Sequence, residues 1–338
     1  MSKAGPGKGA AACPLGQKGA EKVKAVDVQR LSGAIQSEID RVIMGKSETV
    51  EQAVLTMLCG GHLLIEDVPG VGKTTLAKAL AKSIGGDFRR IQFTPDLLPT
   101  DITGTSIFLQ NSGEFEFRPG PLFANVVLVD EVNRATPKTQ SALLEAMEER
   151  QVSSDGTTRM LPSPFFVLAT QNNIEMTGTY PLPEAQLDRF FSRVALGYPN
   201  RQAESAVLRG QQVTHPIETI QAVVTLQELV DAQAAVRSVH VDDAIRDYVV
   251  DIVRGTREES QLVLGSSPRG SVYLLHAAQA RAAMQGIDYV RPDDVKDCAA
   301  AILGHRIILR GEVRAKGITG GDIIRQIMES VPTPVPVH

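Results

Sequence analysis

The 338-residue chain lacks, or has little of, the residues on which several classes of protein depend. Tryptophan is absent and aromatic residues make up only 4%, which disfavours a surface that binds single-stranded nucleic acid by base stacking. The three cysteines, Cys13, Cys59 and Cys298, are far apart, so they indicate neither a disulfide framework nor a CxxC metal site. The histidines follow no HExxH or similar spacing, so the sequence contains no histidine-based metal motif.

Long hydrophobic runs are missing as well. No apolar stretch approaches the roughly 20 residues that cross a bilayer, and no apolar segment precedes a secretory cleavage site near the N-terminus. We therefore expect a cytoplasmic protein with no membrane partner. The net charge of -4 and the pI near 5.9 argue mildly against a nucleic-acid partner, because nucleic-acid binding depends on neutralising phosphates.

Changes in composition divide the chain into four regions. Residues 1–26 are rich in Gly, Ala and Lys and have no apolar periodicity, which predicts a disordered basic tail. Residues 27–200 alternate short apolar strands with helical segments, which indicates an α/β core. Residues 201–330 repeat apolar residues at spacings of three and four, which predicts a helical domain. Residues 331–338 contain three prolines and are expected to form a second flexible tail.

The strongest motif is EDVPGVGKTT at residues 66–75, between an apolar strand and a predicted helix. Gly70 and Gly72 allow the backbone to turn its N–H groups toward phosphate oxygens, and the helix N-terminus adds partial positive charge. In such a loop the lysine contacts the β- and γ-phosphates, and the hydroxyl after it ligates Mg²⁺. Asp67 departs from the pattern, since it stands where GxxxxGK[ST] has its first glycine. The predicted nucleotide-binding residues are Gly70, Val71, Gly72, Lys73, Thr74 and Thr75.

Two further apolar strands end in residues that complete such a site. The segment NVVLVDEVNRA delivers Asp130 and Glu131 at the carboxyl end of a strand, where α/β sheets bind ligands. Asp130 would hold Mg²⁺ together with Thr74, and Glu131 would orient and deprotonate the attacking water. The segment FFVLATQNN ends beside the phosphates and offers Asn172 to the γ-phosphate or to that water.

With these three elements in this order, the chain closely resembles the MoxR family of AAA+ ATPases over about residues 28–330. Asp67 also looks like the MoxR form of the loop, whereas Asn173 departs from the proline that more often follows the sensor asparagine. The resemblance implies an ATPase that uses ATP and Mg²⁺. It also implies an α/β fold with a P-loop AAA+ parallel-sheet core, hairpin insertions and, after them, a small all-α lid domain. The segments that carry it are HLLIEDVPGVGKTTLAKALA, RIQFTPDLLPTDITG, GPLFANVVLVDEVNRATPKTQSALLEAMEE, TGTYPLPEAQLDRF and SSPRG.

Further roles come from the resemblance alone. It makes Asn172 the first sensor and Arg189 the arginine finger that reaches the γ-phosphate of a neighbouring subunit, with Arg193 as the alternative. Arg269, in SSPRG, looks like the second sensor, which ties the lid to the nucleotide. The segment that usually packs on adenine in this family corresponds to Ile43, Met44 and Gly45.

An arginine finger implies sites between subunits, and the resemblance suggests a homo-oligomer, specifically a hexamer. Alternating residues around Asn111-Ser112-Gly113 and around Asp155-Gly156 predict hairpins over Thr105–Arg118 and Gln151–Met160. These hairpins are candidate contacts for a protein client. The resemblance therefore implies a chaperone-like remodeller that matures or activates a protein complex, with a von Willebrand factor A domain protein as a candidate partner.

Two alternative functions remain open from the sequence. A nucleic-acid motor of the same clade would be expected to have basic hairpins, yet the two hairpins carry three acidic residues against Arg118 and Arg159. A nucleotide-gated scaffold that does not hydrolyse ATP is disfavoured by the intact pair Asp130 and Glu131. A small-molecule kinase or a GTPase fits less well, because the sequence has no NKxD-type guanine motif.

Overall fold

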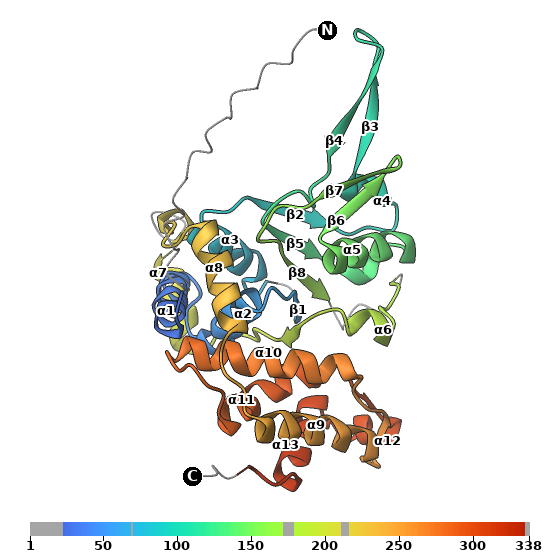
Figure 1. Cartoon of the computed structure of the whole chain (residues 1–338). Helices are drawn as coiled ribbons and strands as arrows, with labels where there is room; N and C mark the ends of the chain where they lie inside the picture. The colour runs from blue at the N-terminus through green and yellow to red at the C-terminus, as the bar shows by residue number, and fades with distance from the viewer. Residues whose placement is uncertain (1–22, 69, 172–178, 211–215, 335–338) are drawn as a thin grey trace, which may run out of the picture.

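The computed structural model describes residues 23–68, 70–171, 179–210 and 216–334, except for the side chains of residues 206–210. At its centre lies a parallel sheet whose strands follow the order β2-β5-β8-β1-β9 (Figure 1). Each neighbouring pair is parallel, so the chain must cross over the sheet between strands. The strands are β1 (Leu63–Glu66), β2 (Phe88–Gln92), β5 (Val126–Asp130), β8 (Phe166–Gln171) and β9 (Ser192–Val194).

Alternate residues of the central strands pack on opposite faces of the sheet. In β1, Leu63 and Ile65 belong to one buried apolar cluster and Leu64 to another, because successive side chains of a strand point to opposite sides. Helices therefore cover both faces, and all of β5 is buried. On the first face lie α1 (Ala25–Asp40), α2 (Ser47–Leu58) and α3 (Lys73–Ser83); on the second lie α4 (Pro99–Thr103) and α5 (Pro137–Glu149). Shorter connecting elements are η1 (Val132–Arg134), α6 (Glu184–Leu187), α7 (Arg201–Gly210) and η2 (Pro216–Thr219).

Two β-hairpins project from the core, as the alternating sequence predicts (Figure 1). The first is the longer, and it extends beyond the rest of the described chain in this view. The second turns at Asp155 and Gly156, which both have positive φ, as a two-residue hairpin turn requires. The hairpins consist of β3 (Gly104–Leu109) with β4 (Glu114–Pro119), and β6 (Gln151–Ser154) with β7 (Thr157–Met160).

The C-terminal part of the chain is a helical lid. Two of its helices begin with a threonine whose hydroxyl accepts a backbone N–H three residues later, and these are Thr225 for α8 and Thr319 for α13. Two others, α10 and α11, begin with a proline in the first turn, where no N–H is needed. The lid contains α8 (Leu226–Arg237), α9 (Asp243–Glu258), α10 (Pro268–Met284), α11 (Pro292–Leu303), α12 (Gly311–Ala315) and α13 (Gly320–Ser330), with a small sheet of β10 (Leu262–Leu264) and β11 (Ile308–Leu309).

The lid and the core share one apolar cluster. Helix α10 packs along α1 and α2, and α8 packs against α1, so the N-terminal helices lie between the sheet and the lid. Fully buried residues of this cluster include Ile35 of α1, Leu58 of α2, Leu274 of α10 and Ile302 of α11. The position of the lid is therefore set by side chains of the core.

Some boundaries differ from the expectations. Helix α1 begins at Ala25, two residues inside the segment 1–26 that was expected to be a tail, and residues 1–22 lie outside the described part of the chain. Strands β2 and β9 lie at the two edges of the sheet and were not predicted. Among the helices of the described residues, none is long and apolar enough to cross a membrane.

Candidate active site

The phosphate-binding loop lies where the sequence places it, between β1 and α3. Gly70 and Gly72 have φ values of 84° and 99°, a backbone region that favours glycine, and Gly72 is the residue that precedes α3. The first turn of α3 presents Lys73 and Thr74 to a cavity of about 350 Å³. The cavity is lined by Gly70, Gly72, Lys73, Thr74, Thr75, Arg90, Gln92, Asp130, Glu131 and Thr170. The side chain of Val71 instead packs against the apolar cluster, so only its backbone is available to a nucleotide.

Asp67 has a structural role at the position where the loop pattern has glycine. Among the described residues, the non-glycine positions with positive φ do not include Asp67, so glycine is not required here. The Asp67 carboxylate accepts hydrogen bonds from the backbone N–H groups of Val68 and Gly197. It thereby ties the loop to the segment that follows β9.

The side chain of Lys73 is hydrogen-bonded within the phosphate-binding loop. Its Nζ donates to the carbonyl oxygen of Asp67 at 2.7 Å. Burial lowers the pKa of Lys73, and the nearby carboxylates of Asp67, Asp130 and Glu131 partly oppose that shift. An incoming phosphate would provide this ammonium group with a charged acceptor in place of a carbonyl.

Asp130 is almost buried at the end of β5. Its Oδ1 accepts a hydrogen bond from the Thr170 hydroxyl at 3.2 Å, and its Oδ2 pairs with Arg90 Nε at 2.6 Å. Carboxylate and hydroxyl oxygens are the ligands that Mg²⁺ prefers, so Asp130 and Thr74 of the same cavity fit this ion. The Arg90 side chain is 52% exposed at the rim, so its own charge would stay in water if Mg²⁺ took its place beside Asp130.

Glu131 has a strained backbone and a restrained side chain. Its φ is 57°, an uncommon value for a non-glycine residue, and its N–H donates to the Thr170 hydroxyl at 2.9 Å. Its Oε2 accepts hydrogen bonds from Gln92 Nε2 at 3.0 Å and from Arg134 Nη1 at 2.8 Å. The carboxylate is therefore fixed at the mouth of the phosphate cavity, where a general base for water would be required.

The segment predicted to contact adenine lies beside the loop. The Cδ1 atom of Ile43 is 3.9 Å from the point that a Cβ on Gly72 would occupy. Met44 is half-buried, and Gly45 approaches Ala203 of α7 so closely that a Cβ there would lie 3.1 Å from the alanine Cβ. This placement agrees with a role beside the base, which stays a prediction.

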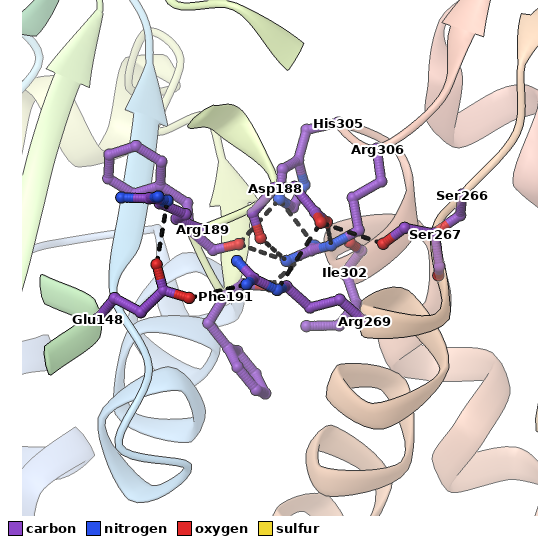
Figure 2. A network of polar contacts seen from close by, with 11 residues as sticks. Glu148, Asp188, Arg189, Phe191, Ser266, Ser267, Arg269, Ile302, His305 and Arg306 are labelled. Carbon is purple, nitrogen blue, oxygen red and sulfur yellow. Dashed lines mark hydrogen bonds and ion pairs between the residues drawn. The ribbon is translucent and has the colours of Figure 1, made fainter. Parts of the chain in front are cut away.

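Arg189 and Arg269 come together on one carboxylate, away from the phosphate cavity. Figure 2 shows both guanidinium groups directed at Glu148, at 3.2 Å for Arg189 Nε and 2.8 Å for Arg269 Nη2. Each of the three side chains is about one-third exposed. Neither arginine lines the cavity that contains Lys73.

The arginine cluster and the phosphate cavity lie at opposite ends of the strands of the sheet. Arg150, next to the end of α5, donates to the carbonyl oxygens of Phe165 and Gly60, which precede β8 and β1. His62 also fixes this end of α5, because its Nε2 contacts the Met147 carbonyl oxygen at 3.0 Å. Glu148 therefore lies at the amino-terminal ends of the strands, whereas the phosphate-binding loop follows the carboxyl end of β1. From Gly60 to Asp67 an extended chain spans roughly 20 Å, more than an arginine side chain can bridge.

Arg193 is engaged within its own chain. Its Nη1 pairs with Glu66 at 3.1 Å, and its Nη2 donates to the Gly304 carbonyl oxygen at 3.2 Å. Glu66 directly precedes the phosphate-binding loop, and Gly304 belongs to the lid. Arg189 also pairs within its own chain, with Glu148, so the choice between Arg189 and Arg193 as the finger stays a prediction. The remaining candidate, Asn172, lies outside the described residues, as does Asn173.

Comparisons with known proteins agree with this geometry. Residues 62–192 match the ATPase family associated with various cellular activities (AAA), and residues 254–327 match the AAA lid domain. Chaperone MoxR1 of Mycobacterium tuberculosis (strain ATCC 25618 / H37Rv) is 42% identical over 319 residues, which cover 92% of this chain and 84% of that protein. The chain belongs to the MoxR family of AAA+ ATPases.

Two further proteins are similar over nearly the whole chain. The Bacillus subtilis (strain 168) protein YeaC is 51% identical over 309 residues, which cover 91% of this chain and 97% of that protein. A crystal structure of a putative ATPase from Cytophaga hutchinsonii ATCC 33406 has a TM-score of 0.86 and 39% identity, and the match covers 92% of this chain and 97% of that one. The α/β P-loop AAA+ fold with a helical lid, predicted from the sequence, is confirmed.

Sequence reasoning missed several residues of this MoxR-family site. Arg90 and Gln92 come from the edge strand β2, which pairs in register with β5 so that Gln92 lies opposite Asp130. The sequence FRRIQ places Arg90 and Gln92 two residues apart, and residues at this spacing on a strand share a face, which was the signal that could have found them. Glu148 gave no local signal, because tertiary packing alone brings it together with Arg189 and Arg269.

We expect Lys73→Ala to weaken ATP binding about 100-fold or more, because it removes the charged donor from a partly buried phosphate site. Titration of a fluorescent ATP analogue measures this change. Lys78→Ala is the matched control, since Lys78 lies on the same helix but is exposed and does not line the cavity. Equal affinity in the two variants would contradict the assignment of Lys73.

Proposed function

We propose that this chain is the ATP-hydrolysing subunit of a homohexameric ring that remodels a protein client. The observation that best supports the proposal is that Arg189 and Arg269 lie away from the chain's own phosphate cavity. Transition-state charge on a transferred phosphoryl group needs a cation such as a guanidinium. If these arginines serve hydrolysis, the phosphate must belong to a neighbouring copy, which supports a ring.

The residues of the cavity have distinct roles in the proposed reaction. Lys73 and the backbone N–H groups of the loop bind the β- and γ-phosphates, and Thr74 and Asp130 would hold Mg²⁺, which would supply positive charge to those phosphates. Glu131 orients the attacking water and accepts its proton as the water oxygen bonds to the γ-phosphorus. The bond to the β-phosphate oxygen breaks, and ADP and phosphate leave. Arg189 of the neighbouring subunit stabilises the charge that develops.

The two hairpins supply a candidate surface for the client. Ser106 of β3 donates to Asp155 Oδ2 at 2.6 Å, and the Arg159 guanidinium lies 3.8 Å from the ring centroid of Phe117. These contacts hold the hairpins together as one arm. Phe108 and Phe115 pair across the longer hairpin with ring centroids 5.2 Å apart, yet they are 51% and 74% exposed. An exposed aromatic pair on a projecting arm suits contact with a protein.

The name of the relative MoxR1, a chaperone, also supports a protein client. We propose a protein complex as the client, with a von Willebrand factor A domain protein as the candidate partner. The remodelling would couple cycles of ATP binding and hydrolysis to movement of the arm.

The test uses Glu131→Gln, which should bind ATP without turning it over. With ATP and Mg²⁺ this variant should form hexamers by native mass spectrometry, because ATP that binds between subunits stabilises the assembly. Proteins retained by the ATP-bound ring are then identified, and a second variant also carries Phe108→Ser and Phe115→Ser. A client of the arm should be retained by the first variant and lost from the second, although both form rings.

Three outcomes would contradict the proposal. A protein that stays monomeric at saturating ATP would exclude the ring. Retention unaffected by the two serine substitutions would exclude the arm as the client surface. Nucleic acid released by salt, in place of a protein, would favour the motor of the same clade.

A further inference from the structure

An ion pair with a buried arginine lies directly behind the arginine cluster. Arg306 follows α11 in the lid, and its side chain is 1% exposed. Its Nε pairs with Asp188 Oδ1 at 2.9 Å, and Asp188 is the residue before Arg189 (Figure 2). The lid and the segment that carries the predicted finger are therefore joined by a charge pair whose arginine is buried and whose carboxylate is 20% exposed.

The guanidinium of Arg306 also fixes the backbone of that segment. It donates to the carbonyl oxygens of Asp188 and Phe191, both at 3.2 Å, and to that of Phe190. Its Cζ lies 4.8 Å from the ring centroid of Tyr273, so the planar group is held on its face as well. Burial lowers the pKa of Arg306 to about 10, and it therefore stays charged at neutral pH. The guanidinium thus binds three carbonyl groups of the 188–191 segment and the Asp188 carboxylate, which is more acceptors than the three N–H donors of a lysine can serve.

Asp188 connects the same pair to the second arginine. Its Oδ2 accepts a hydrogen bond from the Ser267 hydroxyl at 3.1 Å and lies 3.9 Å from Arg269 Nε. Ser267 is the residue that precedes α10, and Arg269 lies in the first turn of that helix. The Asp188 carboxylate therefore connects the start of α10 to the segment that carries Arg189. Arg189 and Arg269 both pair with Glu148 in turn.

We propose that Asp188 and Arg306 are positioning residues that set Arg189 and Arg269 as one unit for the nucleotide of a neighbouring subunit. This inference rests on the proposed function, since it assumes that the two arginines act on another copy. Arg189 and Arg269 are about one-third exposed, and their pairing with Glu148 is screened by water and weak. The less exposed pair of Arg306 and Asp188 behind them holds the backbone from which Arg189 projects. Displacement of a reacting group by about 1 Å costs roughly 100-fold in rate, so this constraint matters for turnover.

The test compares Asp188→Asn, Arg306→Lys and the milder Ser267→Ala. We expect Asp188→Asn and Arg306→Lys to lower kcat about 10- to 100-fold and Ser267→Ala about threefold, with ATP affinity unchanged. Mixing each variant with Glu131→Gln should restore turnover, because the Glu131→Gln subunit offers correctly placed arginines to the intact site beside it. Asp247→Asn and Arg254→Lys, at exposed positions of α9, are the matched controls and should keep full turnover.

The outcomes separate this inference from the proposed function. If mixing with Glu131→Gln restores the turnover of Arg189→Ala but not that of the positioning variants, the inference fails and the proposed ring stands. If mixing does not restore the turnover of Arg189→Ala either, the proposal that the arginines act on a neighbouring subunit fails, and the inference fails with it. Unchanged kcat in the variants that fold, as judged by circular dichroism, would overturn the positioning role. If Asp188→Asn or Arg306→Lys does not fold, Ser267→Ala decides, since it removes one hydrogen bond and no charge.

Discussion

Replacing Arg189 by alanine should lower ATP turnover about 1,000-fold or more while ATP still binds, because a finger stabilises the transition state and not the bound ground state. The chain's own cavity does not contain Arg189, so its affinity for ATP should not depend on that side chain. Turnover is measured by phosphate release at saturating ATP, and affinity by titration of a fluorescent analogue. Arg254→Ala, at an exposed position of the lid, should behave like the unchanged protein.

Mixing distinguishes action on a neighbour from action within one chain. Arg189→Ala keeps Glu131, and Glu131→Gln keeps Arg189, so a ring that contains both variants should have some complete sites. Turnover should therefore reappear on mixing two inactive proteins. Its absence in mixed rings verified by native mass spectrometry would rule out a finger that acts between subunits.

Glu131→Gln should lower turnover by about 100- to 10,000-fold and leave ATP binding intact, because the amide cannot accept the proton of the attacking water. The substitution keeps the size of the side chain and its hydrogen-bond acceptor for Gln92 and Arg134, so the local structure should persist. Single-turnover hydrolysis of radiolabelled ATP separates slow chemistry from slow product release. The control is Glu145→Gln, an exposed position on α5. Equal single-turnover rates in the two variants would remove Glu131 from the role of general base.

The centre of the fold could be predicted from the sequence because its signals are local. Strands β1, β5 and β8 are short apolar runs that end at polar residues, and the loop pattern requires a strand before it and a helix after it. Strand β2 gave a weaker signal, because FRRIQ lies at the edge of the sheet and three of its five residues are exposed. Strand β9 is only three residues long, which is too short for a periodic pattern.

The arginine cluster could be predicted only in part. Arg189 and Arg269 were found by resemblance, but their common partner Glu148 lies 41 residues before the first and 121 before the second. Arg306 follows Asp188 by 118 residues, and nothing in the sequence relates the two. Contacts of this kind arise from how the lid packs on the core, and a single sequence contains no information on such pairing.

The apolar cluster that α1, α2, α8 and α10 share has a consequence for how the molecule melts. Removing the lid would expose buried side chains of the N-terminal helices to water, so a fragment that ends near residue 200 should aggregate. Heating should give one cooperative transition in place of separate transitions for the core and the lid. A nucleotide bound at the loop would then raise the melting temperature of the most distant lid helix together with that of α3, although it touches only one of them.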